Sequence, residues 1–182
     1  MQQDAVDMIT SLSVFFRTSL SKGKDIIPLS EEKRHTLSYL EIQQSRYRDI
    51  MEFEINIPPE LDEVMVPKLT LQPLAENALY HGIKNKRGKG KILITGKKQG
   101  DKIIFQVIDN GKGMTEEELN SLRKKMAGTD TGDEAKGFGV SNVNQRIKYY
   151  YGEEYGVFFE SKENEGTNAT IIIAAKNIQL PS

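Results

Sequence analysis

Four side chains that could take part in chemistry stand in one short stretch, LQPLAENALYHG, at residues 71–82. They are Glu76, Asn77, Tyr80 and His81, and the last three have the i, i+3, i+4 spacing of one helix face. An asparagine oxygen suits Mg²⁺, which takes few protein ligands when phosphates supply the others. Glu76 could serve as a general base. The structural alternatives are a hydrogen-bonded core amide and a surface glutamate.

A second candidate stretch is DNGKGM, residues 109–114, at the end of an apolar segment. Asp109 could accept a hydrogen bond from an exocyclic amine, which is a common way to fix adenine. Gly111 and Gly113 lack a Cβ, so the backbone could approach a ligand closely. The alternative is an ordinary Asp-Asn-Gly turn, since such triplets are frequent in loops.

The third candidate stretch is KGFGV, residues 136–140. Gly137 and Gly139 open a helix there, and backbone N–H groups at the positive end of a helix dipole can bind phosphate. Lys136 could add positive charge. The alternative is a pair of loop glycines beside a solvated lysine.

The elements that must position these groups follow from hydrophobic periodicity and from capping signals. Helices are expected over residues 5–20, from Ser30 as N-cap to about Arg48, over about 68–81, over 115–126 with Thr115 and Glu118 as a capping box, and over about 140–151. Strands are expected over residues 51–57, 90–96, 102–109, 157–161 and 168–174, with the second and third forming a hairpin. Residues 127–139 are small, polar and rich in glycine, which predicts a loop. The sum predicts an α+β fold, a two-layer sandwich preceded by a helical segment.

Composition excludes several classes of protein. The 182 residues are enough for one domain, or for one domain with a helical appendage. The formal net charge is −1 with both signs mixed along the chain, which argues against binding to nucleic acid. The absence of cysteine excludes disulfides and thiolate metal sites. No apolar run approaches the roughly 20 residues of a membrane span, and no signal peptide is visible.

The order of these motifs resembles a known ATP-binding fold. A polar-marked helix, D-x-G-x-G after a strand, G-x-G opening a helix and a Gly166-Thr167 pair before a last strand are similar to the Bergerat-type fold of gyrase, the large heat-shock chaperone, histidine kinases and MutL. More narrowly, PKLTLQPLAENALYHGI, GFGVSNVNQRIKYYYGEEYG and PLSEEKRHTLSYLEIQQSRY resemble bacterial sensor histidine kinases of the LytS/YesM type. The resemblance covers residues 5 to 174 and implies a two-layer α/β sandwich with a mixed sheet.

The resemblance implies a role for each motif residue. Asn77 matches the asparagine that binds Mg²⁺ bridging the phosphates of ATP, and Glu76 matches the residue proposed to activate the attacking histidine. Asp109 matches the aspartate that receives the adenine amino group. Gly111 and Gly113 match the glycines that shape this wall of the site. ATP and Mg²⁺ are therefore the expected cofactors.

The other matches concern the phosphates and the far end of adenine. The two glycines of KGFGV match those beside the phosphates, and Thr167 matches a threonine near adenine. Tyr80 departs from the pattern, because many histidine kinases have a phosphate-contacting lysine there. His81 or Lys136 could replace that contact. Residues 114–136 correspond to a lid expected to close over nucleotide.

The resemblance also implies that the phosphate acceptor is missing. Kinases of this family accept phosphate on a histidine within a P-H-F-x-Y-N stretch, and neither His35 nor His81 lies in one. Residues 5–20 resemble the second helix of the dimerisation hairpin. We therefore expect a truncated kinase that binds Mg-ATP but cannot phosphorylate itself in cis. Its expected parts are a hairpin remnant and linker at 1–30, a catalytic domain at 31–176 and a tail at 177–182.

The expected partners also come from the family. They are a response regulator and, in the full-length protein, a second copy in a homodimer, with this part on the cytoplasmic side of a cell membrane. One alternative is another ATPase or a serine kinase of the same fold, which steady ATP hydrolysis would favour. The other is an interaction module without nucleotide binding, which a thermal shift assay with ATP analogues would reveal.

Overall fold

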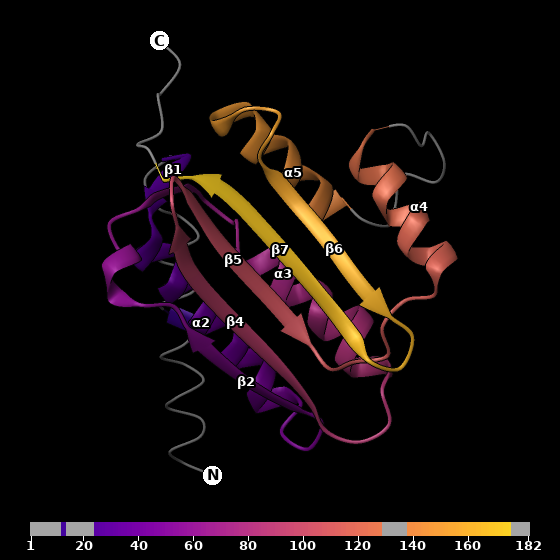
Figure 1. The fold of residues 1–182 in the computed structure, drawn as a ribbon. Helices are drawn as coiled ribbons and strands as arrows, with labels where there is room; N and C mark the ends of the chain where they lie inside the picture. The colour runs from indigo at the N-terminus through magenta and orange to yellow at the C-terminus, as the bar shows by residue number, and fades with distance from the viewer. Residues whose placement is uncertain (1–11, 14–23, 129–137, 176–182) are drawn as a thin grey trace.

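Five strands form one mixed sheet, with helices on one of its faces (Figure 1). The computed structural model describes residues 12–13, 24–128 and 138–175. The spatial order of the sheet is β2 (Met51–Asn56), β4 (Gly90–Gln99), β5 (Lys102–Asp109), β7 (Gly166–Ala174) and β6 (Gly156–Lys162). The β2–β4 pair is parallel and the three other pairs are antiparallel. The predicted two-layer α+β sandwich with a mixed sheet is confirmed.

The helices divide between the face and the edge of this sheet. In Figure 1, α2 (Leu29–Arg46), α3 (Gln72–Asn77) and α5 (Phe138–Tyr151) lie behind the sheet, and α4 (Glu116–Met126) lies beyond the edge strand β6. A small antiparallel sheet of β1 (Ile26–Pro28) and β3 (Met65–Pro67) connects the start of α2 to the segment before α3. Short 3₁₀ turns occur at Pro59–Leu61 and Ile83–Asn85.

The core follows from alternation along the strands. In β5, Ile103, Phe105 and Val107 point to the helices and are at most 2% exposed, while the residues between them are partly accessible on the other face. Partners from neighbouring strands and from the helices share this burial: Ile92, Ile94, Ile171, Ile173, Leu40, Leu74, Leu79, Val143 and Ile147. Each such side chain stabilises the fold by about 1.5–3 kcal/mol relative to an exposed one. This packing fixes the strand ends at which the motifs lie.

The predicted N-cap of α2 is wrong. Ser30 lies inside the helix, which begins at Leu29 and has Pro28 as its N-cap without a side-chain hydrogen bond. The first amide groups of a helix need acceptors from outside it. The amides of Leu29 and Ser30 donate instead to the backbone carbonyls of Val64 and Asp62, so no capping side chain is required.

The other predicted elements that fall within the described residues agree with the structure in type, and their bounds differ by a few residues. The capping box is confirmed: the Thr115 hydroxyl accepts from the Glu118 amide, and the Glu118 carboxylate accepts from the Thr115 amide. The helix predicted over 68–81 begins only at Gln72. The reason is a turn before it, in which Leu69 has φ of 60°, a left-handed conformation that ends helical winding.

Parts of the prediction fall outside the described residues. These are the helix over 5–20, apart from Leu12 and Ser13, most of the loop over 127–139, and the tail over 177–182. Within the described ranges, none of the helices is both long and apolar enough to cross a lipid bilayer.

Candidate functional site

A cavity of about 320 Å³ lies where the end of the Asn77 helix, the end of β5, α4 and β7 meet. Five predicted site residues line it: Asn77, His81, Asp109, Gly113 and Thr167. The rest of its lining is Gly82, Lys112, Met114, Glu118, Ser121, Leu122 and Lys125. A larger hollow of about 550 Å³ between α5 and the turn after β3 contains none of the predicted residues. The smaller cavity is therefore the candidate site.

The helix that carries Asn77 changes its winding inside the site. α3 ends at Asn77, and Ala78–Gly82 continue it as a π-helical turn. Because a π turn forms i→i+5 hydrogen bonds, it is wider than an α turn and brings residues i, i+4 and i+5 to one side. Asn77, His81 and Gly82 accordingly line the cavity, whereas Tyr80 lies outside its lining. The face that lines the cavity is therefore Asn77, His81 and Gly82, and not the predicted face with Tyr80.

The floor of the cavity is a contact between two backbone segments. A Cβ on Gly111 would lie 2.3 Å from the carbonyl carbon of Gly82, and a Cβ on Gly82 would lie 2.4 Å from Oδ1 of Asp109. The Lys112 amide donates to the Gly82 carbonyl at 3.2 Å. Only residues without side chains permit this approach. Gly111 is among the residues predicted from the sequence, whereas Gly82 is not, although Gly82 ends the motif LQPLAENALYHG.

Asp109 is the one carboxylate of the lining that is buried. Its side chain ends β5, is 4% exposed, and accepts a 2.8 Å hydrogen bond from the Gly111 amide. Burial raises the pKa of Asp109 to about 6, while hydrogen bonds from the Gly111 and Thr167 amides and the charge of Lys86 act in the opposite direction. A buried carboxylate at a cavity wall is a strong acceptor for an N–H group.

A hydroxyl network connects two walls of the cavity. The Ser161 hydroxyl donates to the Gly166 carbonyl at 2.8 Å and accepts from the Met114 amide at 2.9 Å. Since Ser161 has a single hydroxyl proton, Thr167, whose oxygen is 2.9 Å away, must donate to it. The lone pairs of Thr167 are therefore available as acceptors at the cavity. Ser161 was not predicted, because serine on an edge strand carries no distinctive sequence signal.

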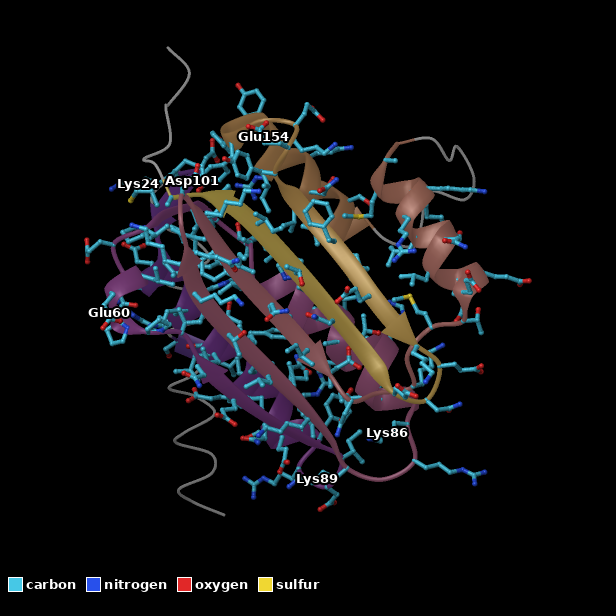
Figure 2. All side chains as sticks on the ribbon, in the orientation of Figure 1. Lys24, Glu60, Lys86, Lys89, Asp101 and Glu154 are labelled. Carbon is cyan, nitrogen blue, oxygen red and sulfur yellow. The ribbon has the colours of Figure 1, made fainter. Side chains whose placement is uncertain are left out.

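Positive side chains gather at this end of the molecule. Lys112 and Lys125 line the cavity, and Lys86 donates to the Asn110 carbonyl at 2.6 Å. Figure 2 shows Lys86 at the end of the sheet opposite Asp101. The lining positions of α4 are 118, 121, 122 and 125, an i, i+3, i+4, i+7 face that could have been read from the sequence. These cations suit an anionic ligand.

Lys125 belongs to the part of the cavity nearest α5. The end of α4 is held against α5 by the Asn144 side-chain amide, which donates to the Met126 carbonyl at 3.1 Å. Lys125 precedes Met126 and is half-buried. Asp109 and Thr167 are paired residues of β5 and β7, so they lie together at another wall. The site therefore combines a buried carboxylate at the paired ends of β5 and β7 with a lysine on α4.

Glu76, Tyr80 and Gly139 are described by the structure and do not line this cavity. Glu76 is exposed, and the ring of Tyr80 lies 4.9 Å from the Lys84 ammonium. Gly139 borders a neighbouring hollow, where an added Cβ would be 3.6 Å from Pro73. Lys136 and Gly137 lie outside the described residues. The binding and catalytic roles assigned to all the predicted site residues, including the five that line the cavity, stay predictions.

The side chains that line the cavity suit a Mg²⁺ ion that binds together with the phosphates of a ligand. Within residues 24–128 and 138–175 no group of three or more His, Cys, Asp or Glu side chains could hold a metal ion. Mg²⁺ does not need such a group, because it keeps several waters and takes phosphate oxygens beside one or two protein ligands. The amide oxygen of Asn77, which lines the cavity, could be such a ligand.

Two protein families match this chain. Residues 67–177 match the family described as histidine kinase-, DNA gyrase B-, and HSP90-like ATPase. Residues 1–51 match the histidine kinase family.

Curated relatives match along nearly all of the chain. Sensor histidine kinase YesM of Bacillus subtilis is 34% identical over 176 residues, which are 97% of this chain and 29% of YesM. Sensor protein LytS of Bacillus anthracis is 33% identical over 175 residues, 96% of this chain and 29% of LytS. Sensor histidine kinase BtsS of Escherichia coli is 27% identical over 169 residues, 93% of this chain and 28% of BtsS. The chain thus spans less than a third of the length of these relatives.

Solved structures share the fold. The catalytic domain of histidine kinase ThkA superposes with a TM-score of 0.60 at 20% identity, over 82% of this chain and 95% of that domain. The histidine kinase domain of a blue-light activated kinase from Erythrobacter litoralis gives 0.57 at 17% identity, over 93% of this chain and 74% of the other.

Proposed function

Because the chain belongs to the family of histidine kinase-, DNA gyrase B- and HSP90-like ATPases, we propose that it is the ATP-binding catalytic part of a sensor histidine kinase. The observation that carries this proposal is that Asn77 and the buried Asp109, which lies against a floor of glycine backbone, line one and the same cavity. The Asp109 carboxylate accepts a hydrogen bond from the adenine amino group. The side-chain oxygen of Asn77 holds the Mg²⁺ that accompanies the phosphates.

The chemistry is then mostly positioning and charge neutralisation, as in other phosphoryl transfers. Thr167 offers acceptors near adenine, and Lys125 of α4 supplies positive charge for the phosphates. When bound, Mg²⁺ neutralises charge on the transferring phosphate. Glu76 is exposed and directly precedes Asn77, so an incoming histidine can reach it as a base.

The acceptor histidine is proposed to lie on another segment or another chain. His35 is only 2% exposed, and burial together with the charge of Lys68 lowers its pKa to about 4. A histidine inside the core cannot reach a γ-phosphate. His81 lines the cavity itself and is assigned to nucleotide binding. A response regulator as phosphate recipient, a homodimer and a location on the cytoplasmic side of a membrane complete the proposal for the full-length protein.

Calorimetry with a non-hydrolysable ATP analogue and Mg²⁺ tests the proposal directly. We expect saturable binding, and weaker binding of the matching GTP analogue. Absence of binding at millimolar concentration contradicts the proposal. Steady ATP hydrolysis by the isolated chain favours another ATPase of the same fold instead.

Asn77→Ala is expected to remove the Mg²⁺-dependent part of the affinity. The change deletes one ligand oxygen, so the analogue should bind about tenfold more weakly with Mg²⁺ and almost unchanged in EDTA, a loss of about 1.4 kcal/mol. Calorimetry in the two buffers measures this. An equal loss in both buffers contradicts a role of Asn77 at the metal.

Adenine binding is expected to weaken below pH 6. The carboxylate form of Asp109 is the acceptor, and its pKa is about 6. At pH 5 only about a tenth of the protein carries that form, so the affinity should fall up to tenfold between pH 7.5 and pH 5. Adenosine measured by NMR titration is the suitable ligand, because it has no phosphate that titrates. His81→Gln is the control and should keep this profile, and a flat wild-type profile contradicts the role of Asp109.

A further inference from the structure

A carboxylate outside the cavity is fully buried between α2 and the turn before α3. Glu32 is 0% exposed, and its two oxygens accept from the amides of Leu69 at 2.9 Å and Leu71 at 2.8 Å. Burial raises the pKa of Glu32, and backbone amides at 69–72 act in the opposite direction. Burying a carboxylate costs several kcal/mol unless it is well hydrogen-bonded, so this arrangement calls for an explanation.

The carboxylate oxygens of Glu32 accept hydrogen bonds from backbone amides just before the helix that carries Asn77. The first amides of a helix have no partner within it, and α3 has no side-chain cap of its own. Glu32 supplies the missing acceptor at the start of this helix, because its carboxyl oxygen accepts from the Leu71 amide. A residue of α2 thus performs the capping that the segment before Gln72 does not.

The turn held by Glu32 has little freedom. Leu69 has φ of 60°, and the Lys68 amide donates to the Asp25 carbonyl at 2.9 Å. The Lys68 carbonyl accepts from the Arg146 guanidinium at 2.5 Å. A turn restrained on several sides transmits its position to the helix that follows it.

The same helix is fixed at its other end. Gly82 packs against Gly111, and a Cβ on Gly82 would collide with Asp109. Between these ends, Asn77 lies six residues after Leu71, about 9 Å along an α-helix axis. Because Gly82 is held at the Asp109 wall, a displacement at the start of this segment has to be taken up between residues 71 and 82, the interval that contains Asn77.

We propose that Glu32 is a positioning residue of the ATP site: it sets the position of α3, residues 72–77, and thereby directs Asn77 toward the metal end of the cavity. The inference rests on the proposed function, because Asn77 matters only if Mg-nucleotide binds. Glu32 itself touches neither nucleotide nor metal, since it does not line the cavity.

The test compares Glu32→Gln with the wild-type chain by calorimetry of the ATP analogue in Mg²⁺ and in EDTA. Glutamine keeps the shape but has one acceptor oxygen for two amides. We expect affinity in EDTA to stay within about twofold, and the gain produced by Mg²⁺ to shrink at least about fivefold. Tyr151→Phe is the matched control, because it removes one part-buried hydrogen bond, to the Met65 carbonyl at 2.7 Å, from the same region. It should keep the full Mg²⁺ gain.

A full Mg²⁺ gain in Glu32→Gln, or an equal loss of that gain in Tyr151→Phe, overturns the inference and leaves the proposed function intact. No binding by the wild-type chain overturns both.

Hydrogen exchange of the wild-type chain is a second test, which needs no variant and so does not depend on whether a variant folds. Mg-nucleotide should slow exchange of the Leu69 and Leu71 amides by at least about tenfold, because the coupling is reciprocal. Unchanged exchange overturns the inference.

Discussion

Asp109→Asn is expected to weaken ATP binding by about 100-fold and, at the same time, to stabilise the nucleotide-free chain at neutral pH. The loss of affinity arises because asparagine has a single acceptor oxygen, and the Gly111 amide already uses one oxygen of Asp109. The new NH₂ group then faces the adenine amino group, donor against donor. A lost hydrogen bond to a charged group and an unsatisfied donor together cost about 2–4 kcal/mol.

The gain in stability follows from the raised pKa. The folded state holds a proton on Asp109 more tightly than the unfolded chain does, so ionisation of Asp109 destabilises the fold as the pH rises from about 4 to about 6. The shift corresponds to about 3 kcal/mol above pH 6. Asparagine does not ionise, but it offers one acceptor to the amides of Gly111 and Thr167, so a net gain of about 1–2 kcal/mol is expected.

Calorimetry and urea denaturation at pH 5 and pH 7.5 measure the two effects. The stabilisation should be larger at pH 7.5. Asp101→Asn is the matched control: this carboxylate is exposed at the far end of the sheet, and its removal should change neither quantity (Figure 2). ATP affinity within about threefold of wild type would place the adenine wall elsewhere.

The sheet could be predicted from the sequence because one face of each strand is buried. KIIFQVID alternates as β5 does, and the alternation is a local consequence of that burial. The capping box at Thr115 was predictable for the same reason, since its contacts lie within four residues. β1 and β3 were not predictable, because a three-residue strand shows no periodicity.

The site was predictable only in part, because several of its features depend on distant contacts. Leu71, Leu74, Ala75 and Ala78 fit an ordinary α-helix, and nothing local indicates the π turn that brings His81 to the cavity and leaves Tyr80 outside. The contact between the two glycines of the floor spans 29 residues. Glu32 within a polar helical stretch is typical of a surface position, and only the tertiary fold buries it.

Gly113→Ala is expected to destabilise the chain by more than about 3 kcal/mol, for two separable reasons. Gly113 has φ of +65°, which costs an alanine about 1–2 kcal/mol. In addition, a Cβ there would lie 1.9 Å from the carbonyl oxygen of Lys162, a backbone atom of β6. The hairpin of β6 and β7 would have to move, which breaks the hydrogen bonds from the Asn164 amide to the Lys112 carbonyl and from the Met114 amide to Ser161.

Gly100→Ala separates the two causes. Gly100 has φ of +62°, nearly that of Gly113, but an added Cβ meets no atom within 4 Å. Its replacement should therefore cost only the backbone strain of about 1–2 kcal/mol in urea denaturation. Gly113→Ala should also lower ATP affinity, since the displaced hairpin carries Thr167 and Gly100→Ala leaves that wall in place. Equal losses of stability in the two variants would contradict this prediction. They would mean that the loop after β5 is not packed against β6, and that the proposed adenine wall is not supported by that contact.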